Sequence, residues 1–325
     1  MRAVLSTGWG GPDRLILAEV PNPPVTPGCI RVDVAGAAVN FADLLMIAGK
    51  YHENPPLPFS PGFEVAGTVR EVAAGVTGWA VGDRVMGMLP HGGYAEQVVL
   101  PVDQAFCVPD GLDLIAAAGF PVAYGTAYAS LAWRARLRPG EHLLVFGSAG
   151  GVGLAAVEIG RMLGATVIAV ASGTERLAVA ADHGASHLID HRTSDVAARV
   201  REITGGGGAD VILDPVGGEA FEAGLRCIAS EGRLVVVGFA SGQVGQLSAG
   251  VALGRNIDLI GCYWGAYRGA DGGRVRGAYD ELARWVTSGR LRPHVGARFP
   301  LAEAPQALAM LRDRGVAGKI ILTMK

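Results

Sequence analysis

Residues 142–153 read HLLVFGSAGGVG, an apolar run followed by a glycine-rich turn, and a helical pattern then continues to Leu163. A strand, a glycine turn and a helix N-terminus form the context that a dinucleotide-binding fingerprint requires. Glycines let backbone N–H groups approach a pyrophosphate, and the helix N-terminus adds partial positive charge. In this segment Ser148 takes the place of the first glycine of G-x-G-x-x-G, and Gly153 lets the helix pack close to the strand. The predicted phosphate-binding residues are Ser148, Ala149, Gly150, Gly151, Val152 and Gly153.

Short apolar runs alternate with helical patterns on both sides of this turn. The expected strands are 142–146, 166–171, 186–189, 210–214, 233–238 and 258–261, and the clearest helices are 152–163 and 175–183. Almost wholly apolar strands that alternate with helices are typical of a parallel sheet buried on both faces. The sequence therefore predicts an α/β fold with a doubly wound parallel sheet.

The flanking regions have a different pattern. The first 120 residues contain short strands, such as 29–34, 66–72 and 94–100, separated by turns rich in proline and glycine. Two helices and a terminal strand are expected at 277–288, 302–314 and 319–324. We predict a β-rich domain over residues 1–120, completed by about 262–325, and a nucleotide-binding domain over residues 121–261.

Composition excludes several classes of protein. Among 325 residues the net charge is −2 and half are hydrophobic, which excludes a mainly disordered chain and argues against bulk electrostatic binding of nucleic acid or anionic lipid. Charges interrupt every long apolar stretch, and the N-terminus lacks an apolar signal-peptide core, so we expect a cytoplasmic protein with no membrane span. The four cysteines are scattered, which argues against a structural zinc or disulfide framework.

The end of strand 166–171 indicates the choice of cofactor. An NAD enzyme usually places a carboxylate there to hold the ribose hydroxyls. This chain instead continues with Ser172 and Gly173, and Arg176 follows. Because Ser172 and Arg176 suit a 2′-phosphate, the sequence favours NADPH over NADH. The alternative role for Arg176 is that of an exposed first-turn residue, and Glu175 beside it would weaken an anion site.

Motifs along nearly the whole chain resemble zinc-free medium-chain dehydrogenases/reductases, specifically the NADPH:quinone oxidoreductase (ζ-crystallin-like) group. The matching segments are VNFADLLMIAGKY (39–51), PLPFSPGFEVAGTV (56–69), GGYAEQVVLP (92–101), GTAY (125–128), GSAGGVG (147–153), DPVGG (214–218) and GK (318–319). The segment CYWGAYR (262–268) also resembles one bacterial branch of that group. The resemblance implies a Rossmann domain, a GroES-like domain, and a homodimer formed near residues 258–263.

The same resemblance predicts that no catalytic metal is bound. Zinc-dependent relatives place a cysteine after the first core strand and a Gly-His-Glu later, but this chain has Asn40 in the first segment and Gly62-Phe63-Glu64 in the second. A catalytic zinc needs three protein ligands, and two of the usual ones are missing. The histidines spaced by four (His183, His187 and His191) are not expected to converge, because Gly184 should end their helix.

The resemblance also implies the residues beside the substrate. It places Asn40 and Tyr51 next to the nicotinamide as weak hydrogen-bond donors, with roles in strand-end bonding and loop packing as their alternatives. Asp43 is a candidate substrate-binding residue whose alternative role is to cap a helix or orient backbone. Tyr263 and Trp264 are expected to line the substrate site or to pack between subunits.

Further cofactor contacts are implied in the same way. Thr126 is expected near the nicotinamide, with a helix-start cap as its alternative role. His191 is expected near the adenosine, and Gly238 and Phe239 end a strand on the cofactor side. Lys319 is expected to face the cofactor phosphates.

These inferences predict an NADPH:quinone oxidoreductase-like enzyme of EC 1.6.5 type that passes hydride to quinones or related α,β-unsaturated carbonyls without zinc. One alternative is a C=C reductase acting on enones or enoyl thioesters. A second is a non-catalytic NADPH-binding sensor or moonlighting protein. The expected partner is a small molecule, with no nucleic acid and no membrane.

Overall fold

The computed structural model describes residues 1–268 and 272–324, which form two compact units. Unit 1 comprises Met1–Val122, Gly265–Gly289 and Pro293–Lys325, and unit 2 comprises Ala123–Trp264 and Arg290–Arg292. The short piece 290–292, which the sequence had placed in the first domain, joins unit 2 because the Arg292 N–H donates to Glu158 Oε1 at 2.9 Å.

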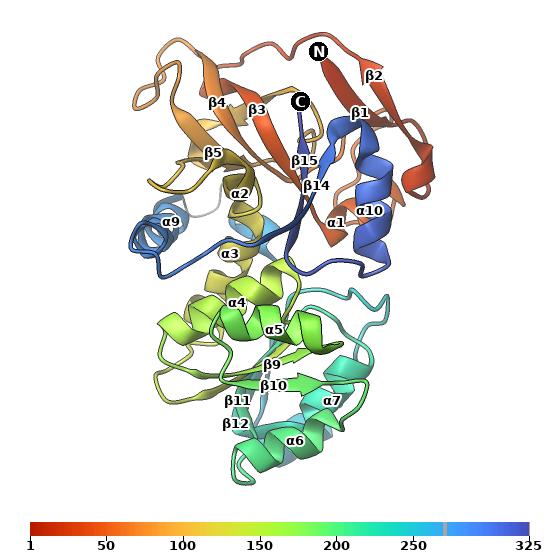
Figure 1. Cartoon of the computed structure of the whole chain (residues 1–325), viewed down its shortest axis with the longest axis vertical. Helices are drawn as coiled ribbons and strands as arrows, with labels where there is room; N and C mark the ends of the chain where they lie inside the picture. Colours follow the sequence, from red (N-terminus) through yellow and green to blue (C-terminus); the bar gives the residue numbers. More distant parts are fainter. Residues whose placement is uncertain (269–271, 325) are drawn as a thin grey trace. The chain divides into compact units, whose positions relative to one another are not determined.

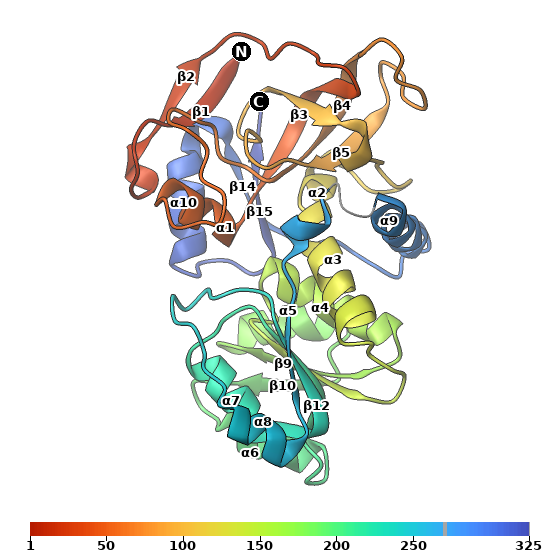
Figure 2. The same ribbon diagram turned by 180° about the vertical axis from the view of Figure 1, so that it is seen from behind.

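Unit 2 contains a six-stranded parallel sheet in the order β10-β9-β8-β11-β12-β13. Its strands are β8 (His142–Phe146), β9 (Thr166–Ala171), β10 (His187–Asp190), β11 (Ala209–Asp214), β12 (Ile228–Val236) and β13 (Asp258–Gly261). Its helices are α4 (Gly151–Met162), α5 (Thr174–Asp182), α6 (Val196–Ile203), α7 (Glu219–Cys227) and α8 (Ala249–Arg255). Helices α4 and α5 cover one face of the sheet, and α6 and α7 cover the other (Figures 1 and 2). The doubly wound α/β prediction is therefore confirmed.

The strand order reverses between β8 and β11, since β8 pairs with β9 on one side and with β11 on the other. In open α/β sheets, ligands bind at the carboxyl ends of the strands at such a reversal. The glycine turn follows β8 directly and therefore lies at the position where the fold is built to take a ligand.

Unit 1 is built on a seven-stranded sheet, in the order β14-β15-β3-β4-β5-β7 with β6 paired to β3. Its strands are β3 (Cys29–Val39), β4 (Glu64–Val72), β5 (Arg84–Met88), β6 (Gln97–Pro101), β7 (Ala105–Cys107), β14 (Val295–Pro300) and β15 (Lys319–Thr323). A separate antiparallel pair is formed by β1 (Arg2–Ser6) and β2 (Leu15–Glu19). This unit confirms the separate β-rich, GroES-like part of the predicted fold.

The remaining helices are α1 (Phe41–Ile47), α2 (Leu114–Ala118), α3 (Pro121–Tyr128), α9 (Gly272–Thr287) and α10 (Ala304–Arg312). Single turns of tighter or wider helix occur at Pro12–Arg14, Val102–Gln104, Ala129–Arg134, Trp264–Tyr267 and Leu301–Glu303. Each unit has its own buried apolar core, one around β3 and β4 and the other around β8, β9 and β11.

One strand pairing in unit 1 brings together two polar residues from the two ends of the chain. The C-terminal strand β15 runs antiparallel to β3, with Ile320 opposite Val39. This register brings Lys319 beside Asn40, although the two residues are far apart in the chain.

Candidate functional site

The turn after β8 requires glycine at two positions. Gly147 has a φ of +57°, a conformation that L side chains rarely adopt. A Cβ on Gly153 would lie only 2.1 Å from the carbonyl oxygen of Gly147. The hydroxyl of buried Ser148 donates to Val170 O at 3.0 Å and ties the turn to β9. The Ser148 N–H also donates to Val170 O, at 3.1 Å, so both donors of Ser148 shape the turn, and the predicted phosphate contact falls to the N–H groups that follow it.

Helix α4 begins within this turn, with Gly150 as its N-cap and no acidic residue in its first turn. The N–H groups of Gly151, Val152 and Gly153 are in the first turn of the helix, where no preceding helical carbonyl can accept them. Together with the helix dipole they favour an anion at this end. The arrangement fits the pyrophosphate of a dinucleotide.

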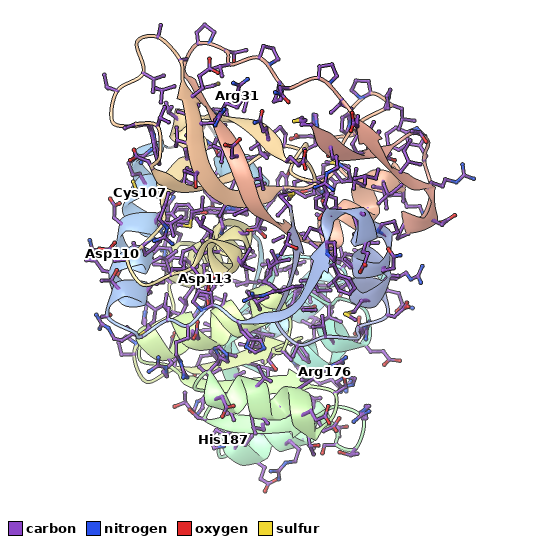
Figure 3. The ribbon with its side chains drawn as sticks, turned by 45° about the horizontal axis from the view of Figure 1, so that its top comes forward. Arg31, Cys107, Asp110, Asp113, Arg176 and His187 are labelled. Atoms are coloured by element: carbon purple, nitrogen blue, oxygen red, sulfur yellow. The ribbon has the colours of Figure 1, made fainter. Side chains whose placement is uncertain are left out.

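The predicted 2′-phosphate residues come together after β9. Arg176 Nη1 donates to Ser172 Oγ at 2.8 Å, so the hydroxyl and the guanidinium lie side by side at the start of α5. In Figure 3, Arg176 and His187 lie at separate places on unit 2.

The three histidines spaced by four residues do not share one face. Nδ1 of buried His183 lies 2.9 Å from Glu158 Oε1, whereas His187 begins β10 and His191 follows that strand.

Sequence reasoning missed a second arginine at this site. Asp190, at the end of β10, accepts the Gly173 N–H at 3.0 Å and pairs with Arg192 at 3.3 Å. A Cβ on Gly173 would lie 2.7 Å from Arg192 Nη2, so this guanidinium lies directly over the Ser172–Gly173 turn. Hydrogen bonds from Arg192 hold the pKa of Asp190 at about 2, so this carboxylate remains ionised and bound to its partners. Arg192 directly follows His191 in the chain, which is the signal that could have drawn attention to it.

The carboxyl end of β11 adds a buried carboxyl group beside the glycine turn. Asp214 Oδ1 accepts the N–H groups of Val216 and Gly217 at 2.8 and 2.9 Å, and burial raises the pKa of Asp214. Its buried Oδ2 has no hydrogen-bond partner within residues 1–268 and 272–324. A Cβ on Gly147 would lie 3.2 Å from Val216 Cγ2, so the turn after β11 packs against the glycine turn after β8.

Other predicted residues of unit 2 take varied positions. Gly238 and Phe239 follow β12, and Phe239 is partly exposed. Thr126 is buried in the later part of α3, which begins at Pro121, so its alternative role as a helix-start cap is wrong. Trp264 is buried against Gly125, where a Cβ would lie 2.4 Å from its ring, so it acts as a packing residue within this unit, whereas Tyr263 is 37% exposed.

In unit 1, Asn40, Glu64 and Lys319 form a buried polar cluster. The Lys319 ammonium donates to Val39 O at 3.2 Å, to Asn40 Oδ1 at 2.7 Å and to Glu64 Oε1 at 2.8 Å. An ammonium has three N–H donors, and all three are used here. This arrangement differs from the predicted role of Lys319 facing the cofactor phosphates, because the antiparallel β15–β3 pairing turns Lys319 into the unit's interior.

The same cluster changes the role of Asn40. Its amide oxygen faces Lys319, which can only donate, and its Nδ2 donates to Glu64 Oε1 at 3.0 Å and to Ala38 O at 3.3 Å. Both amide N–H groups are therefore used within the protein. The predicted donation from Asn40 to a substrate oxygen does not fit this geometry, and the strand-end bonding role given as its alternative does.

Asp43 is fully buried and contacts this cluster through Asn40. It accepts the Asn40 N–H and the Tyr94 hydroxyl on Oδ2, at 2.8 and 2.9 Å, and the Gly62 N–H on Oδ1 at 2.9 Å. Burial raises the pKa of Asp43 to about 7 against the lowering effect of these bonds. Because Asp43 is buried among these partners, it is a positioning residue for the start of α1 and for Gly62, rather than a substrate contact.

Tyr51 packs edge-on against Phe63, with ring centroids 5.2 Å apart. Phe63 stands at the position where zinc-dependent relatives were expected to carry a histidine ligand. No group of three or more His, Cys, Asp or Glu side chains suited to a metal occurs among the residues that the structure describes.

Within the same residues, no helix is long and apolar enough to cross a membrane.

Comparison with known proteins places the chain in a family. Residues 26–110 match the alcohol dehydrogenase GroES-like domain, and residues 151–287 match the zinc-binding dehydrogenase family. The mouse quinone oxidoreductase-like protein 2 is 37% identical over 325 residues, which cover 100% of this chain and 92% of that protein. A Nematostella vectensis homologue of that protein is 40% identical over 91% of this chain and 82% of its own length.

Solved structures agree with these sequence matches. Escherichia coli quinone oxidoreductase complexed with NADPH has a TM-score of 0.93 at 28% identity and covers 99% of this chain and 100% of its own. A mycobacterial protein complexed with NADPH has a TM-score of 0.93 at 32% identity, with the same coverage. The chain belongs to the quinone oxidoreductase group of the medium-chain dehydrogenase/reductase family.

Proposed function

We propose that this chain is an NADPH-dependent, zinc-independent oxidoreductase that reduces quinones or related α,β-unsaturated carbonyls. The observation that carries the proposal is the glycine turn at Gly147–Gly153 together with the Ser172–Arg176 pair at 2.8 Å. The first fits a pyrophosphate and the second fits a 2′-phosphate. Relatives that are named quinone oxidoreductases, or that are solved with NADPH, support it.

The preference for NADPH rests on charge at the end of β9. Ser172 and Arg176 offer a hydroxyl and a guanidinium to the added phosphate, and Arg192 adds a second guanidinium nearby. Two carboxylates lie near this turn: Glu175 in the first turn of α5, and Asp190, which the Gly173 N–H and Arg192 already hold. Charge-assisted bonds to phosphate are stronger than neutral ones. NADH has no 2′-phosphate, so it forms none of these bonds, and we expect it to bind more weakly than NADPH.

Bound NADPH supplies a hydride to an electron-poor carbon of the acceptor, and a proton from water completes the reduction to quinol or saturated carbonyl. The residues of the chain bind and orient. The α4 N-terminus holds the pyrophosphate, and Tyr51 is the proposed donor to the acceptor oxygen. Asn40 acts indirectly, because its amide is fixed between Lys319 and Glu64 and its N–H is fixed on Asp43.

Zinc independence is supported by how the corresponding positions are used. Phe63 is an apolar side chain packed on Tyr51, and Glu64 accepts bonds from Lys319, Asn40 and the Val122 N–H. A glutamate committed in this way is a poor metal ligand. Carbonyl polarisation must then come from hydrogen bonds. Homodimer formation remains a prediction from the resemblance, and a cytoplasmic location remains a prediction from the N-terminal sequence and the interrupted apolar stretches.

The variant Arg176→Ala tests the cofactor assignment. Removing a charge-assisted bond to phosphate costs about 1.5–3 kcal/mol, so the Kd for NADPH should rise by roughly 10- to 100-fold while the Kd for NADH changes little. Fluorescence titration of both cofactors measures this without turnover. Arg199→Ala removes an exposed arginine from α6 and serves as the control. Equal weakening of both cofactors by Arg176→Ala would contradict the 2′-phosphate assignment.

A further inference from the structure

Arg268, directly after the Trp264–Tyr267 turn, carries a half-buried guanidinium that the fold does not fully use. Its side chain is only 16% exposed. Its Nη2 contacts Glu53 Oε2 at 3.2 Å, and its Nε donates to Gly265 O at 3.3 Å. A guanidinium has five N–H donors. The other donors, including both on Nη1, have no hydrogen-bond partner among the described residues.

The hydrogen bond from Arg268 to Glu53 contributes little to stability. Glu53 is 59% exposed, and among the residues that the structure describes it makes one contact to Arg268, not a bidentate pair. Exposed single contacts of this kind contribute little, because solvent screens the charge and the glutamate keeps its freedom to move. The N–H groups that Glu53 does not use are not among the buried atoms without a partner, so a carboxylate that makes two bonds can compete with this single contact.

Arg268 is connected through Glu53 to the segment that carries Tyr51. Glu53 follows Tyr51 by two residues, and Tyr51 packs on Phe63. His91, whose ring is 6.2 Å from that of Phe59, has its pKa lowered by burial and by the charge of Arg268. His91 therefore stays neutral at pH 7, and the positive charge in this cluster is that of Arg268.

We propose that Arg268 is a specificity residue that binds a carboxylate carried by the acceptor, with Glu53 holding the guanidinium until that carboxylate takes its place. A planar fork with two free N–H groups suits a bidentate carboxylate. Tyr51, the proposed donor to the acceptor oxygen, lies two residues before Glu53, so the acid group and the conjugated part of one molecule are expected to meet the same segment. The proposal rests on the proposed reductase function and narrows its substrates to acidic quinones or unsaturated acids.

The test compares 2-methyl-1,4-benzoquinone with 2-carboxymethyl-1,4-benzoquinone as acceptors for NADPH. The measured quantity is the ratio of kcat/KM for the acid to kcat/KM for the neutral quinone, because the intrinsic difference between the quinones cancels when variants are compared. Arg268→Gln should lower this ratio at least tenfold through KM for the acid and leave the neutral quinone unaffected. Glu53→Gln should raise the ratio, since it removes the competing carboxylate. Arg298→Gln, an exposed arginine of β14 in the same unit, is the control.

Equilibrium binding keeps the two proposals separable. Benzoate should bind the wild type with heat detectable by calorimetry and bind Arg268→Gln at least tenfold more weakly, whether or not any quinone is reduced. An unchanged acid-to-neutral ratio together with unchanged benzoate binding in Arg268→Gln overturns the role of Arg268. Weaker NADPH binding in Arg268→Gln also overturns it, and tighter inorganic phosphate than benzoate binding would reassign the anion. Absence of NADPH oxidation with both quinones, with benzoate binding intact, would count against the reductase function alone.

Discussion

Asp43 shows how a single buried group shapes the site in unit 1. Its carboxyl receives the Asn40 N–H at the start of α1, the Gly62 N–H and the Tyr94 hydroxyl. It therefore fixes two segments that carry the candidate residues Asn40 and Phe63. This role depends on a carboxyl group whose pKa burial raises to about 7.

Asp43 should make stability depend on pH. Its pKa is near 3.8 when unfolded and about 7 when folded, so the folded state binds more protons in between. Stability from this group is complete below about pH 4 and is lost as the pH rises through 7. Asp43→Asn should abolish this slope and lower the free energy of unfolding by about 1–3 kcal/mol, because an amide nitrogen cannot accept the bonds made to Oδ2. Urea unfolding between pH 4 and 8 measures both effects.

The exposed Asp13→Asn is the control for this experiment. A slope that persists unchanged in Asp43→Asn would show that another group titrates and that Asp43 does not carry the pH dependence.

At the scale of elements, local patterns predicted most of what local chemistry determines. The strand–glycine–helix sequence at 142–163 predicted β8 and α4 to within a residue, because steric and dipole requirements lie within that stretch. Ser172 and Arg176, both predicted to bind a 2′-phosphate, lie side by side because they are four residues apart at one helix start. The position of Lys319 was predicted wrongly and Arg268 was given no role, since their partners depend on long-range pairing: Arg268 and Glu53 are 215 residues apart.

The glycine turn yields a prediction for the β8–α4 element. In Gly153→Ala the new Cβ would lie 2.1 Å from Gly147 O, so α4 must shift away from the turn. We expect NADPH binding to weaken at least tenfold and the Tm to fall. Gly254→Ala in α8, where a Cβ meets nothing within 4 Å, should leave the Tm unchanged or higher and NADPH binding intact. Equal NADPH affinity in Gly153→Ala and wild type would contradict the phosphate role of this turn.

At the scale of the whole molecule, each unit contributes its own part of the proposed chemistry. Unit 2 carries the anion sites, in the turn after β8 and at the start of α5. Unit 1 carries Tyr51 on Phe63, the Asn40–Glu64–Lys319 cluster and Arg268. Family resemblance predicted this division, whereas the interior position of Lys319 and the full use of the Asn40 amide required the three-dimensional structure.

The most direct test of the central claim is NADPH oxidation by protein dialysed against a chelator, with its zinc content measured in the same sample. With a 1,4-quinone and, separately, an acyclic enone as acceptors, loss of NADPH absorbance gives kcat/KM for each. We predict turnover that favours the quinone in protein holding far less than one zinc per chain. No NADPH oxidation with either acceptor, or activity that disappears together with a full equivalent of zinc, would contradict the account, and a preference for the enone would favour the C=C reductase alternative.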